Sequence, residues 1–220
     1  MKPLKVLVAC EESQAVTKEF RKLGHEAFSC DIQECSGGHP EWHILGDALK
    51  EAYSGKYVLM IAHPPCTYLS KAGARWLYKG GVLNKERYQK GLLGKEFLLN
   101  LLNAPIKHIA IENPVPMNIF NLPLFSQSIQ PYMFGDPYSK KTLLWLKNLP
   151  KLYHNSSVNL FDTMVTHTNS FVPYLPSNTG GKKRGQKFSI GISKNAKQSS
   201  KTFLGIAKAM AEQWSAYITM

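Results

Sequence analysis

Residues 57–70, YVLMIAHPPCTYLS, are the stretch around which the rest of the chain is organised. Five consecutive apolar residues, 58–62, without polar alternation predict a strand covered on both faces, as in a parallel sheet with helices above and below it. Pro64 and Pro65 end this strand, because each proline fixes its own φ angle and lacks a backbone N–H. Cys66 is therefore expected on a stiff turn at the carboxyl end of a strand, where open α/β sheets bind ligands.

Length and composition indicate one domain. The 220 residues are enough to bury a sizeable core without disulfides, and the four cysteines show no disulfide framework. No apolar run is long enough to span a bilayer, and the first residues lack the pattern of a cleavable secretory signal. We therefore expect a cytoplasmic protein with free thiols and no membrane partner.

The charge of the chain predicts a polyanionic partner. Its net charge is +12, from 27 Lys and Arg against 15 Asp and Glu, which makes nucleic acid the first candidate. The alternative is a basic protein whose excess charge only keeps it dispersed. Lys140 and Lys141 form one basic pair. The basic residues that gather in the segment SNTGGKKRGQK, and are expected to meet nucleic acid, are Lys182, Lys183, Arg184 and Lys187.

The first fifty residues predict a strand, a helix and a second strand. Residues 4–9 are an apolar run, followed by apolar residues at helical spacing that Ser13 could cap and Gly24 could end. Residues 25–30 predict the second strand, which ends at Asp31. An acidic residue at this position commonly holds a ribose hydroxyl pair in nucleotide-binding βαβ folds, and the alternative is a solvated turn aspartate.

The remaining patterns complete an alternation of strands and helices. Residues 70–84 and 123–137 predict loops, the first of them a mobile one over the site. The further elements expected are helices over residues 48–53, 88–102 and 201–217 and strands over residues 106–111, 141–146 and 188–192. The alternation predicts a single domain, residues 1–220, with an α/β fold: a doubly wound, mostly parallel sheet in three αβα layers, with an irregular insertion at about residues 151–187.

Two sets of side chains could carry chemistry. A thiol on a proline-stiffened turn in a basic environment could be partly ionised and nucleophilic, and Glu112 ends a neighbouring predicted strand. Cys66 and Glu112 in one crevice fit covalent attack on an electron-poor ring, and the alternative is a buried thiol and an exposed acid. The second set, which could in principle bind zinc, is Cys30, Cys35, His39 and His43. Its spacing is unusual for a zinc finger, so no metal is expected and Cys10 and Cys30 are taken as core residues.

Three motifs occur in the order of a known family. PPC at residues 64–66, ENP at 112–114 and GDPYSKKTLLWL at 135–146 resemble the C5-cytosine DNA methyltransferases, which carry a Pro-Cys loop, then Glu-Asn-Val, then Gln-x-Arg-x-Arg. LVACEESQAVTKEFRKLGHEAFSCDI resembles their opening cofactor segment, and Gly46-Asp47 resembles their next cofactor contact. The resemblance extends over most of the chain, and it is nearest to short methyltransferase-like proteins encoded by bacteriophages.

The resemblance implies a fold of the class I S-adenosylmethionine-dependent methyltransferase type and a mechanism. Cys66 would attack C6 of a flipped cytosine, Glu112 would bond N3, and C5 would take a methyl group from S-adenosylmethionine. Lys140 takes the place of the first arginine, and Asn113 would brace the Cys66 loop. The cofactor contacts implied are Ala9, Cys10, Glu11, Asp31 (ribose), Ile32, Asp47 (adenine amino group) and Pro64. The substrate or loop contacts implied are Pro65, Ser70, Asn113 and Lys141.

The chain also departs from the family. The glycine-rich cofactor loop is here Cys10-Glu11-Glu12-Ser13, so close backbone approach to the cofactor is less assured. Thr142 stands in place of the second arginine, and residues 151–187 are too short for the usual target recognition domain. Other substrates therefore stay open: another pyrimidine, a free nucleotide or RNA. A non-catalytic nucleic-acid-binding or host-interaction protein also stays open, as does a homodimer or a partner that supplies specificity.

Overall fold

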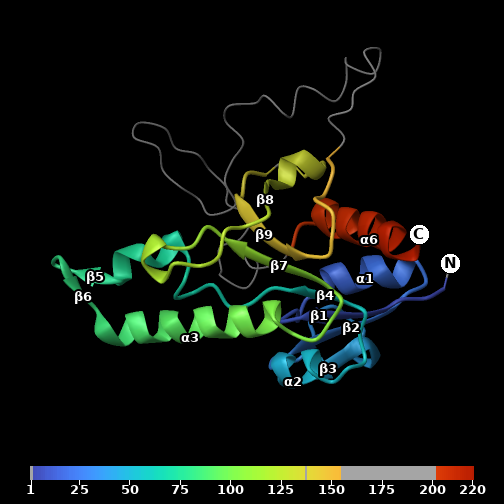
Figure 1. Ribbon diagram of the computed structural model, residues 1–220, viewed down its shortest axis with the longest axis horizontal. Coiled ribbons are helices and arrows are strands. Elements are labelled where there is room, and N and C mark those ends of the chain that lie inside the picture. The colour runs from blue at the N-terminus through green and yellow to red at the C-terminus, as the bar shows by residue number, and fades with distance from the viewer. Residues whose placement is uncertain (1, 137, 155–201) are drawn as a thin grey trace, which may run out of the picture.

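A computed structural model describes residues 2–136, 138–154 and 202–220. Its centre is a seven-stranded sheet with the strand order β3-β2-β1-β4-β7-β9-β8 (Figure 1). These strands are β1 (Lys5–Ala9), β2 (Glu26–Asp31), β3 (His43–Leu45), β4 (Leu59–Ala62), β7 (His108–Pro114), β8 (Gln127–Ile129) and β9 (Thr142–Lys147). The helices in the described ranges are α1 (Ala15–Lys22), α2 (Ala48–Ala52), α3 (Lys85–Leu102) and α6 (Leu204–Thr219).

Short elements connect the larger ones. A separate hairpin pairs β5 (Tyr78–Lys79) with β6 (Val82–Leu83) and projects beyond the start of α3 (Figure 1). Four 3-10 turns occur in the described chain: η1 (Pro40–Trp42), η2 (Lys71–Trp76), η3 (Asn118–Phe120) and η4 (Pro131–Phe134).

Most of the sheet is parallel. Strands β3, β2, β1, β4 and β7 run in one direction, whereas β9 is antiparallel to both of its neighbours, β7 and β8. Parallel neighbours need long crossover connections; α1 lies in the one between β1 and β2, and α3 lies in the one between β4 and β7. The carboxyl ends of β1, β2, β4 and β7 therefore meet at one edge of the sheet.

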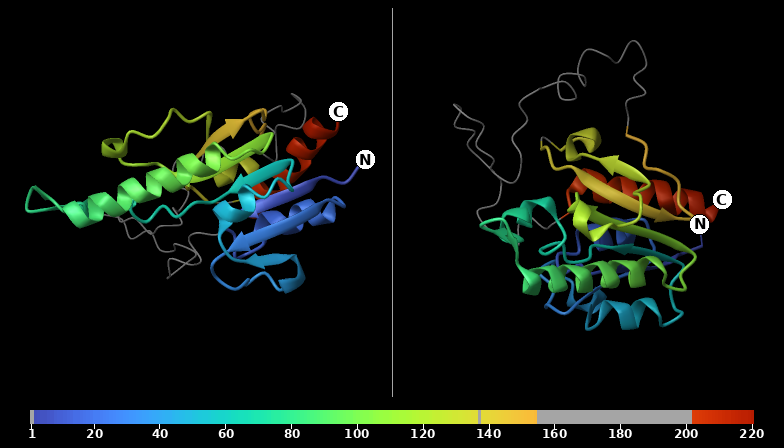
Figure 2. Two further views of the ribbon diagram at one scale, coloured as in Figure 1. Left: turned by 60° about the horizontal axis from the view of Figure 1, so that its bottom comes forward. Right: turned by 60° about the vertical axis from the view of Figure 1, so that its left-hand side comes forward.

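The two faces of the sheet are covered by different helices, as Figures 1 and 2 show. On one face Val8 packs in a buried cluster with Phe20 of α1 and Trp214 of α6. On the other face Met60 packs with side chains of α2 and α3, among them Leu98. Successive strand residues point to opposite faces, so each central strand contributes to both clusters. This confirms the predicted doubly wound, mostly parallel sheet in three αβα layers.

Helix α3 contains two glycines because loop segments pack closely against it. A Cβ atom at Gly91 would overlap the ring of Phe120 in η3, and one at Gly94 would touch Leu69 of the Cys66 loop. Leu69 and Phe120 are both buried and belong to a small separate core cluster. Removing these two Cβ atoms lets the loops after β4 and β7 lie against the helix.

Several local predictions are wrong. Ser13 does not cap α1; the N-cap residue is Gln14, and the side chain of Glu11 accepts the backbone N–H groups of Val16 and Thr17 in the first turn. Residues 70–84 contain η2 and the β5–β6 hairpin, and residues 123–137 contain β8 and η4. Elements of two to six residues carry too few side chains for a period to be recognised in the sequence.

Most of the predicted insertion at residues 151–187 and the whole predicted strand at 188–192 lie outside the described residues. In the part of the chain that is described, no helix combines the length and the apolar character needed to cross a bilayer.

Candidate active site

Three strand ends bring the candidate catalytic residues together. His63, the first residue after β4, donates its backbone N–H to the carbonyl oxygen of Ala9 at the end of β1, at 2.9 Å. In the register of β4 and β7, Ala62 lies beside Ile111, so the next pair is His63 and Glu112. The Cys66 loop and Glu112 therefore share one edge of the sheet, as predicted.

Cys66 lies on a turn that is held from two sides. Its carbonyl oxygen accepts the backbone N–H groups of Leu69 at 3.0 Å and of Ser70 at 2.9 Å. Asn113 of β7 donates its side-chain amide to the carbonyl oxygen of Pro64 at 3.0 Å, and both of these residues are buried. This bond ties the Cys66 loop to the strand that carries Glu112.

The chain beyond Cys66 is also joined to the chain beyond β7. Ser70 and Pro116 form an isolated antiparallel bridge, and Lys71 donates its backbone N–H to Val115 at 2.9 Å. Ser70 is buried in this contact. Any opening of η2 as a lid would have to break these bonds.

His63 and Glu112 form a buried pair that the sequence analysis missed. His63 Nδ1 lies 2.7 Å from Glu112 Oε2, and their side chains are only 11% and 9% exposed. Burial lowers the pKa of His63, but the hydrogen bond and charge of Glu112, with the charge of Glu11, outweigh burial and raise it. Burial raises the pKa of Glu112, whereas the bond to His63, its charge and that of Lys140 bring it below its ordinary value. The only signal in the sequence was a histidine placed directly after a buried strand.

The Cys66 thiol is not activated in this structure. Burial and then the charge of Glu112 raise its pKa, and Lys140 and a backbone hydrogen bond oppose them without reversing the shift. The raised pKa favours the thiol over the partly ionised form that the sequence suggested, and its largest cause is the burial of Cys66. Lys140 influences the pKa of Cys66, Glu112 and His63, so the structure brings this predicted residue to the same place. Lys141 is exposed.

The loop after β1 differs from an open cofactor loop. Cys10 has a positive φ of 60°, a conformation that glycine adopts more easily than a residue with a Cβ. Glu11 is buried, and its carboxylate accepts the backbone N–H of Val16 at 2.6 Å and that of Thr17 at 3.2 Å. Helix α1 therefore has an anion at its N-terminus already, the position at which a ligand carboxylate or phosphate would otherwise bind.

Two predicted acidic residues lie farther along the same edge. Asp31 ends β2 and accepts the backbone N–H of Gln33 at 2.9 Å with Oδ1, and Asp47 caps α2 by accepting that of Leu49 at 2.8 Å, also with Oδ1. The N–H of Gly46 donates to the carbonyl oxygen of Asp31 at 2.9 Å, which ties the two segments together.

The residues at this edge fit part of S-adenosylmethionine. Asp31 and Asp47 each keep a second carboxylate oxygen, Oδ2, for which the described chain records no hydrogen bond, and these could accept hydroxyl or amino groups. Ile32, beside Asp31, is 81% exposed and offers an apolar surface to a purine ring. Asp31, Ile32 and Asp47 could therefore hold the nucleoside part, whereas a second carboxylate at the N-terminus of α1 would meet Glu11.

The candidate zinc ligands do not converge. His39 stacks on Trp42 with ring centroids 3.8 Å apart and pairs with Glu41, while His43 bonds Ser29 and a backbone carbonyl. Nowhere in residues 2–136, 138–154 and 202–220 do three or more His, Cys, Asp or Glu side chains form a group that could hold a metal ion.

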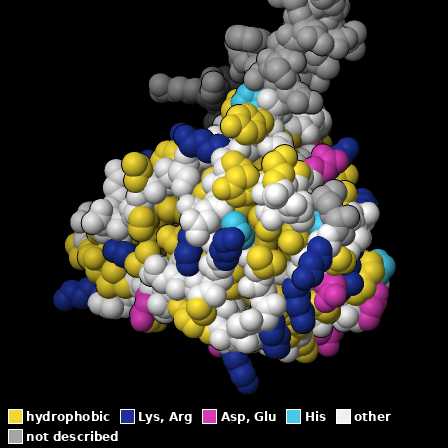
Figure 3. Space-filling model, turned by 45° about the vertical axis from the view of Figure 1, so that its right-hand side comes forward, with side chains coloured by type: hydrophobic (Ala, Val, Ile, Leu, Met, Phe, Trp, Pro, Cys, Tyr) yellow, Lys and Arg dark blue, Asp and Glu magenta, His cyan; other side chains and the backbone are white. Residues whose placement is uncertain are grey.

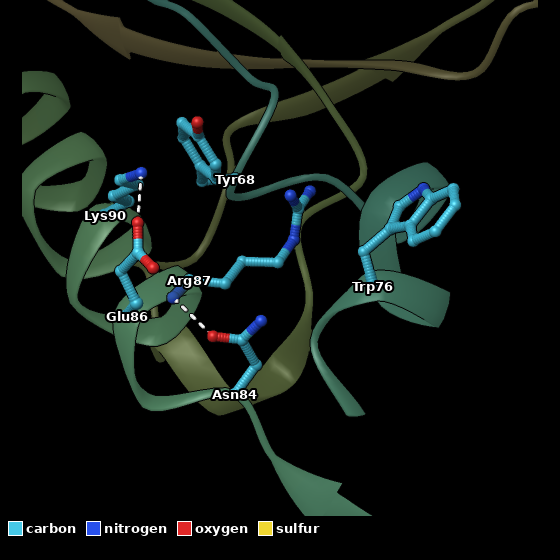
Figure 4. Close-up of a pocket in the computed structure, with 6 residues that line it drawn as sticks. All are labelled: Tyr68, Trp76, Asn84, Glu86, Arg87 and Lys90. Carbon is cyan, nitrogen blue, oxygen red and sulfur yellow. Dashed lines mark hydrogen bonds and ion pairs between the residues drawn. The ribbon is translucent and has the colours of Figure 1, made fainter. Parts of the chain in front are cut away.

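A hollow of about 320 Å³ lies beside the Cys66 loop. Arg87 donates Nη2 to the carbonyl oxygen of Thr67 at 2.9 Å, and its guanidinium lies 4.9 Å from the ring centroid of Tyr68. Figure 4 shows Arg87 between Tyr68 and Trp76, and Trp76 is 59% exposed. The lining residues are Tyr68, Trp76, Asn84, Glu86, Arg87 and Lys90.

The predicted basic segment at residues 182–187 lies outside the described residues. On the face in Figure 3, Lys and Arg side chains are scattered rather than gathered into one patch.

No protein-family model and no curated protein matches the chain. The chain is similar to three solved methyltransferase structures. The first is EhMeth of Entamoeba histolytica, with a TM-score of 0.44, 17% identity and coverage of 70% of this chain and 57% of that one. The second is the S. pombe Dnmt2 methyltransferase, with a TM-score of 0.42, 15% identity and coverage of 68% of this chain and 51% of that one. The third is a proposed DNA modification methyltransferase encoded within an E. coli prophage, with a TM-score of 0.40, 13% identity and coverage of 65% of this chain and 46% of that one. The chain spans about half the length of these structures.

Proposed function

We propose that the chain is a methyltransferase that transfers a methyl group from S-adenosylmethionine to C5 of cytosine in DNA, through a covalent bond between Cys66 and C6. The observation that carries the proposal is the placement of a thiol and a carboxylate at the ends of neighbouring strands, close enough that Glu112 raises the pKa of the Cys66 thiol. Addition of a thiolate to C6 makes C5 nucleophilic, provided that a group at N3 takes up the displaced charge. The order of the PPC, ENP and GDPYSKKTLLWL motifs supports cytosine as the ring.

The neighbouring residues support this chemistry in distinct ways. Lys140 supplies a positive charge that lowers the pKa of the Cys66 thiol and so favours the thiolate. Asn113 holds the carbonyl oxygen of Pro64 and thereby the loop on which Cys66 lies. Asp31, Ile32 and Asp47 would hold the nucleoside part of S-adenosylmethionine, which when bound supplies an electrophilic methyl group.

A nucleic-acid chain is the favoured substrate. The net charge of +12 suits a polyanion, and the hollow beside the Cys66 loop combines the exposed ring of Trp76 with the cations of Arg87 and Lys90. Interleaved aromatic and basic groups bind unpaired bases and the phosphates next to them. Such a surface would support a cytosine that has left the base stack.

The second candidate is a nucleic-acid-binding or host-interaction protein that keeps the scaffold without catalysis. Two observations favour it: the carboxylate of Glu11 at the N-terminus of α1 and the raised pKa of the Cys66 thiol. This candidate predicts that S-adenosylmethionine does not bind at all.

The deciding experiment is a transfer assay. The protein is incubated with phage or bacterial DNA and S-adenosylmethionine carrying a radiolabelled methyl group, and the DNA is digested to nucleosides. Label in 5-methylcytosine is expected with the wild type and with Cys35→Ser, a control change at another half-buried cysteine, and not with Cys66→Ser. Label in another base would show that this base, and not cytosine, is the substrate. Methyl transfer by Cys66→Ser at the wild-type rate would exclude the covalent mechanism.

A further inference from the structure

Glu112 lacks a proton of its own when the reaction needs one. The addition of Cys66 to C6 of the pyrimidine requires N3 to gain a proton as the sulfur–carbon bond forms. The pKa of Glu112 lies below its ordinary value, because the hydrogen bond to His63 and its charge, and then Lys140, outweigh the effect of burial. At neutral pH the carboxylate can accept a hydrogen bond but cannot donate one.

The proton lies one hydrogen bond away. His63 Nδ1 and Glu112 Oε2 are 2.7 Å apart, and both side chains are buried. Glu11, from the loop after β1, also raises the pKa of His63, and Lys140, from the segment before β9, lowers it. Cys66 lies on the same loop as His63. We propose that His63 is the proton store of the site, and that it supplies through Glu112 the proton that N3 of the pyrimidine takes when Cys66 adds to C6. This inference rests on the proposed function.

Burial of the pair favours release of this proton once a base is near. Nε2 of His63 is buried and has no hydrogen-bond partner among the described residues. Nε2 keeps its hydrogen whether or not Nδ1 gives one up, so this unpaired N–H does not distinguish the two states. Only the imidazolium carries a full charge in a poorly solvated place, where an ion is costly, so the proton can move to Glu112 when N3 of the substrate becomes basic.

The step balances in atoms and electrons. The Cys66 thiol first gives its own proton to solvent. The thiolate then forms a bond to C6, the electron pair of C5=C6 becomes the C4=C5 bond, and the pair of C4=N3 takes the proton at N3. Glu112 gives that proton and receives the Nδ1 proton of His63, which becomes neutral. After C5 has formed its bond to the methyl group with the C4=C5 electron pair, its hydrogen leaves as a proton to solvent. The C5–H electron pair forms C5=C6 as the thiolate departs, and the N3 proton returns to the pair as C4=N3 forms again. His63 touches no reacting atom, so it is a positioning and relay residue.

The test is the pH profile of tritium release from DNA that carries [5-³H]cytosine, measured with S-adenosylmethionine for the wild type and His63→Gln. Glutamine can still donate a hydrogen bond to Glu112 but stores no transferable proton. In the variant the only proton that the pair can hold is that of Glu112, whose ordinary pKa of 4.5 lies below the 6.5 of histidine, whereas the pKa of His63 in the wild type is raised further. The variant pair is therefore expected to lose its proton at a lower pH than the wild-type pair. We expect the basic limb of the profile to move to lower pH. At acid pH the rate of the variant should be close to that of the wild type. Above the shifted limb its rate should be lower by on the order of tenfold for each pH unit by which the limb has moved.

The control is His39→Gln, which removes an exposed histidine that also lies beside a carboxylate, Glu41 at 3.0 Å. Its profile should match the wild type. A His63→Gln profile that falls by one factor at every pH would show a merely structural role and overturn the relay. Absence of tritium release from the wild type at every pH would instead overturn the proposed function itself.

If His63→Gln does not fold, NMR titration of the wild type gives an independent answer. His63 is expected to keep its proton above pH 6.5, its ordinary pKa, and to lose it at lower pH in Glu112→Gln. A His63 that titrates alike in both proteins would overturn the proposal.

Discussion

Glu11 holds Thr17 by two hydrogen bonds: Oε2 accepts the backbone N–H at 3.2 Å and the hydroxyl group at 2.7 Å. The carboxylate thereby binds the first turn of α1 from the loop after β1. A glycine-rich loop at this point would leave the N-terminus of the helix open to a bound anion, whereas here the Glu11 carboxylate caps it from within the chain.

The first prediction concerns this cap. Glu11→Ala should lower the free energy of unfolding by about 2 kcal/mol, because it removes a helix cap and leaves buried donors without acceptors. Urea denaturation of the variant measures this effect. Glu26→Ala, at an exposed position, is the matched control and should change stability little. Equal stability of Glu11→Ala and the wild type would mean that solvent replaces the cap.

The second prediction concerns Asn113. Asn113→Ala should reduce methyl transfer at least on the order of tenfold, because the Cys66 loop loses its bond to β7 and the thiol its fixed position. The buried carbonyl oxygen of Pro64 is left unpaired, so the free energy of unfolding should fall by about 1–3 kcal/mol. Transfer rates and thermal melts of Asn113→Ala and of Asn100→Ala, an exposed control on α3, separate the two effects. Full activity of Asn113→Ala would show that the two prolines alone hold the turn.

The third prediction concerns the cofactor. Asp31→Asn and Asp47→Asn should each weaken binding of S-adenosylmethionine, and the fold should survive because asparagine can still accept the bond from Gln33 or Leu49. Isothermal titration calorimetry measures the affinity. Glu34→Gln, an exposed neighbour on the same loop, is the control. No binding by the wild type at millimolar cofactor would favour the non-catalytic scaffold.

The sheet could be predicted because its central strands are continuous apolar runs. The apolar residues 58–62 predict a buried strand without any knowledge of their neighbours in space, and the structure has the fully buried strand β4 there. By contrast β8 has three residues and the strands of the hairpin have two each, so their existence depends on pairing partners rather than on a pattern.

The candidate site was predictable in part. Cys66 and Glu112 could be placed at one edge because each follows an apolar run that predicts a buried parallel strand. The His63–Glu112 bond could not, because it depends on a register that sets Ala62 beside Ile111. The role of Glu11 was also hidden, since a glutamate at a loop gives no sign of which helix its carboxylate will cap.

The last prediction concerns how the protein meets DNA. If its contacts are mainly with phosphates, affinity should fall steeply with salt and differ little between sequences, because each contact releases a counterion. Neutralising Lys182, Lys183 and Arg184 together should then make the slope of log affinity against log salt less steep by up to about 3 units and weaken all DNA alike. Fluorescence anisotropy at several salt concentrations measures this slope.

The control for that measurement removes the same charge elsewhere. Lys2, Lys50 and Lys107 are exposed lysines, and changing all three to glutamine lowers the net charge by the same amount. An equal change of slope in both triple variants would mean that only the overall charge matters. A wild-type protein that held one short sequence over about a thousandfold more tightly than random DNA would contradict phosphate-dominated binding, since that ratio belongs to proteins that read base edges.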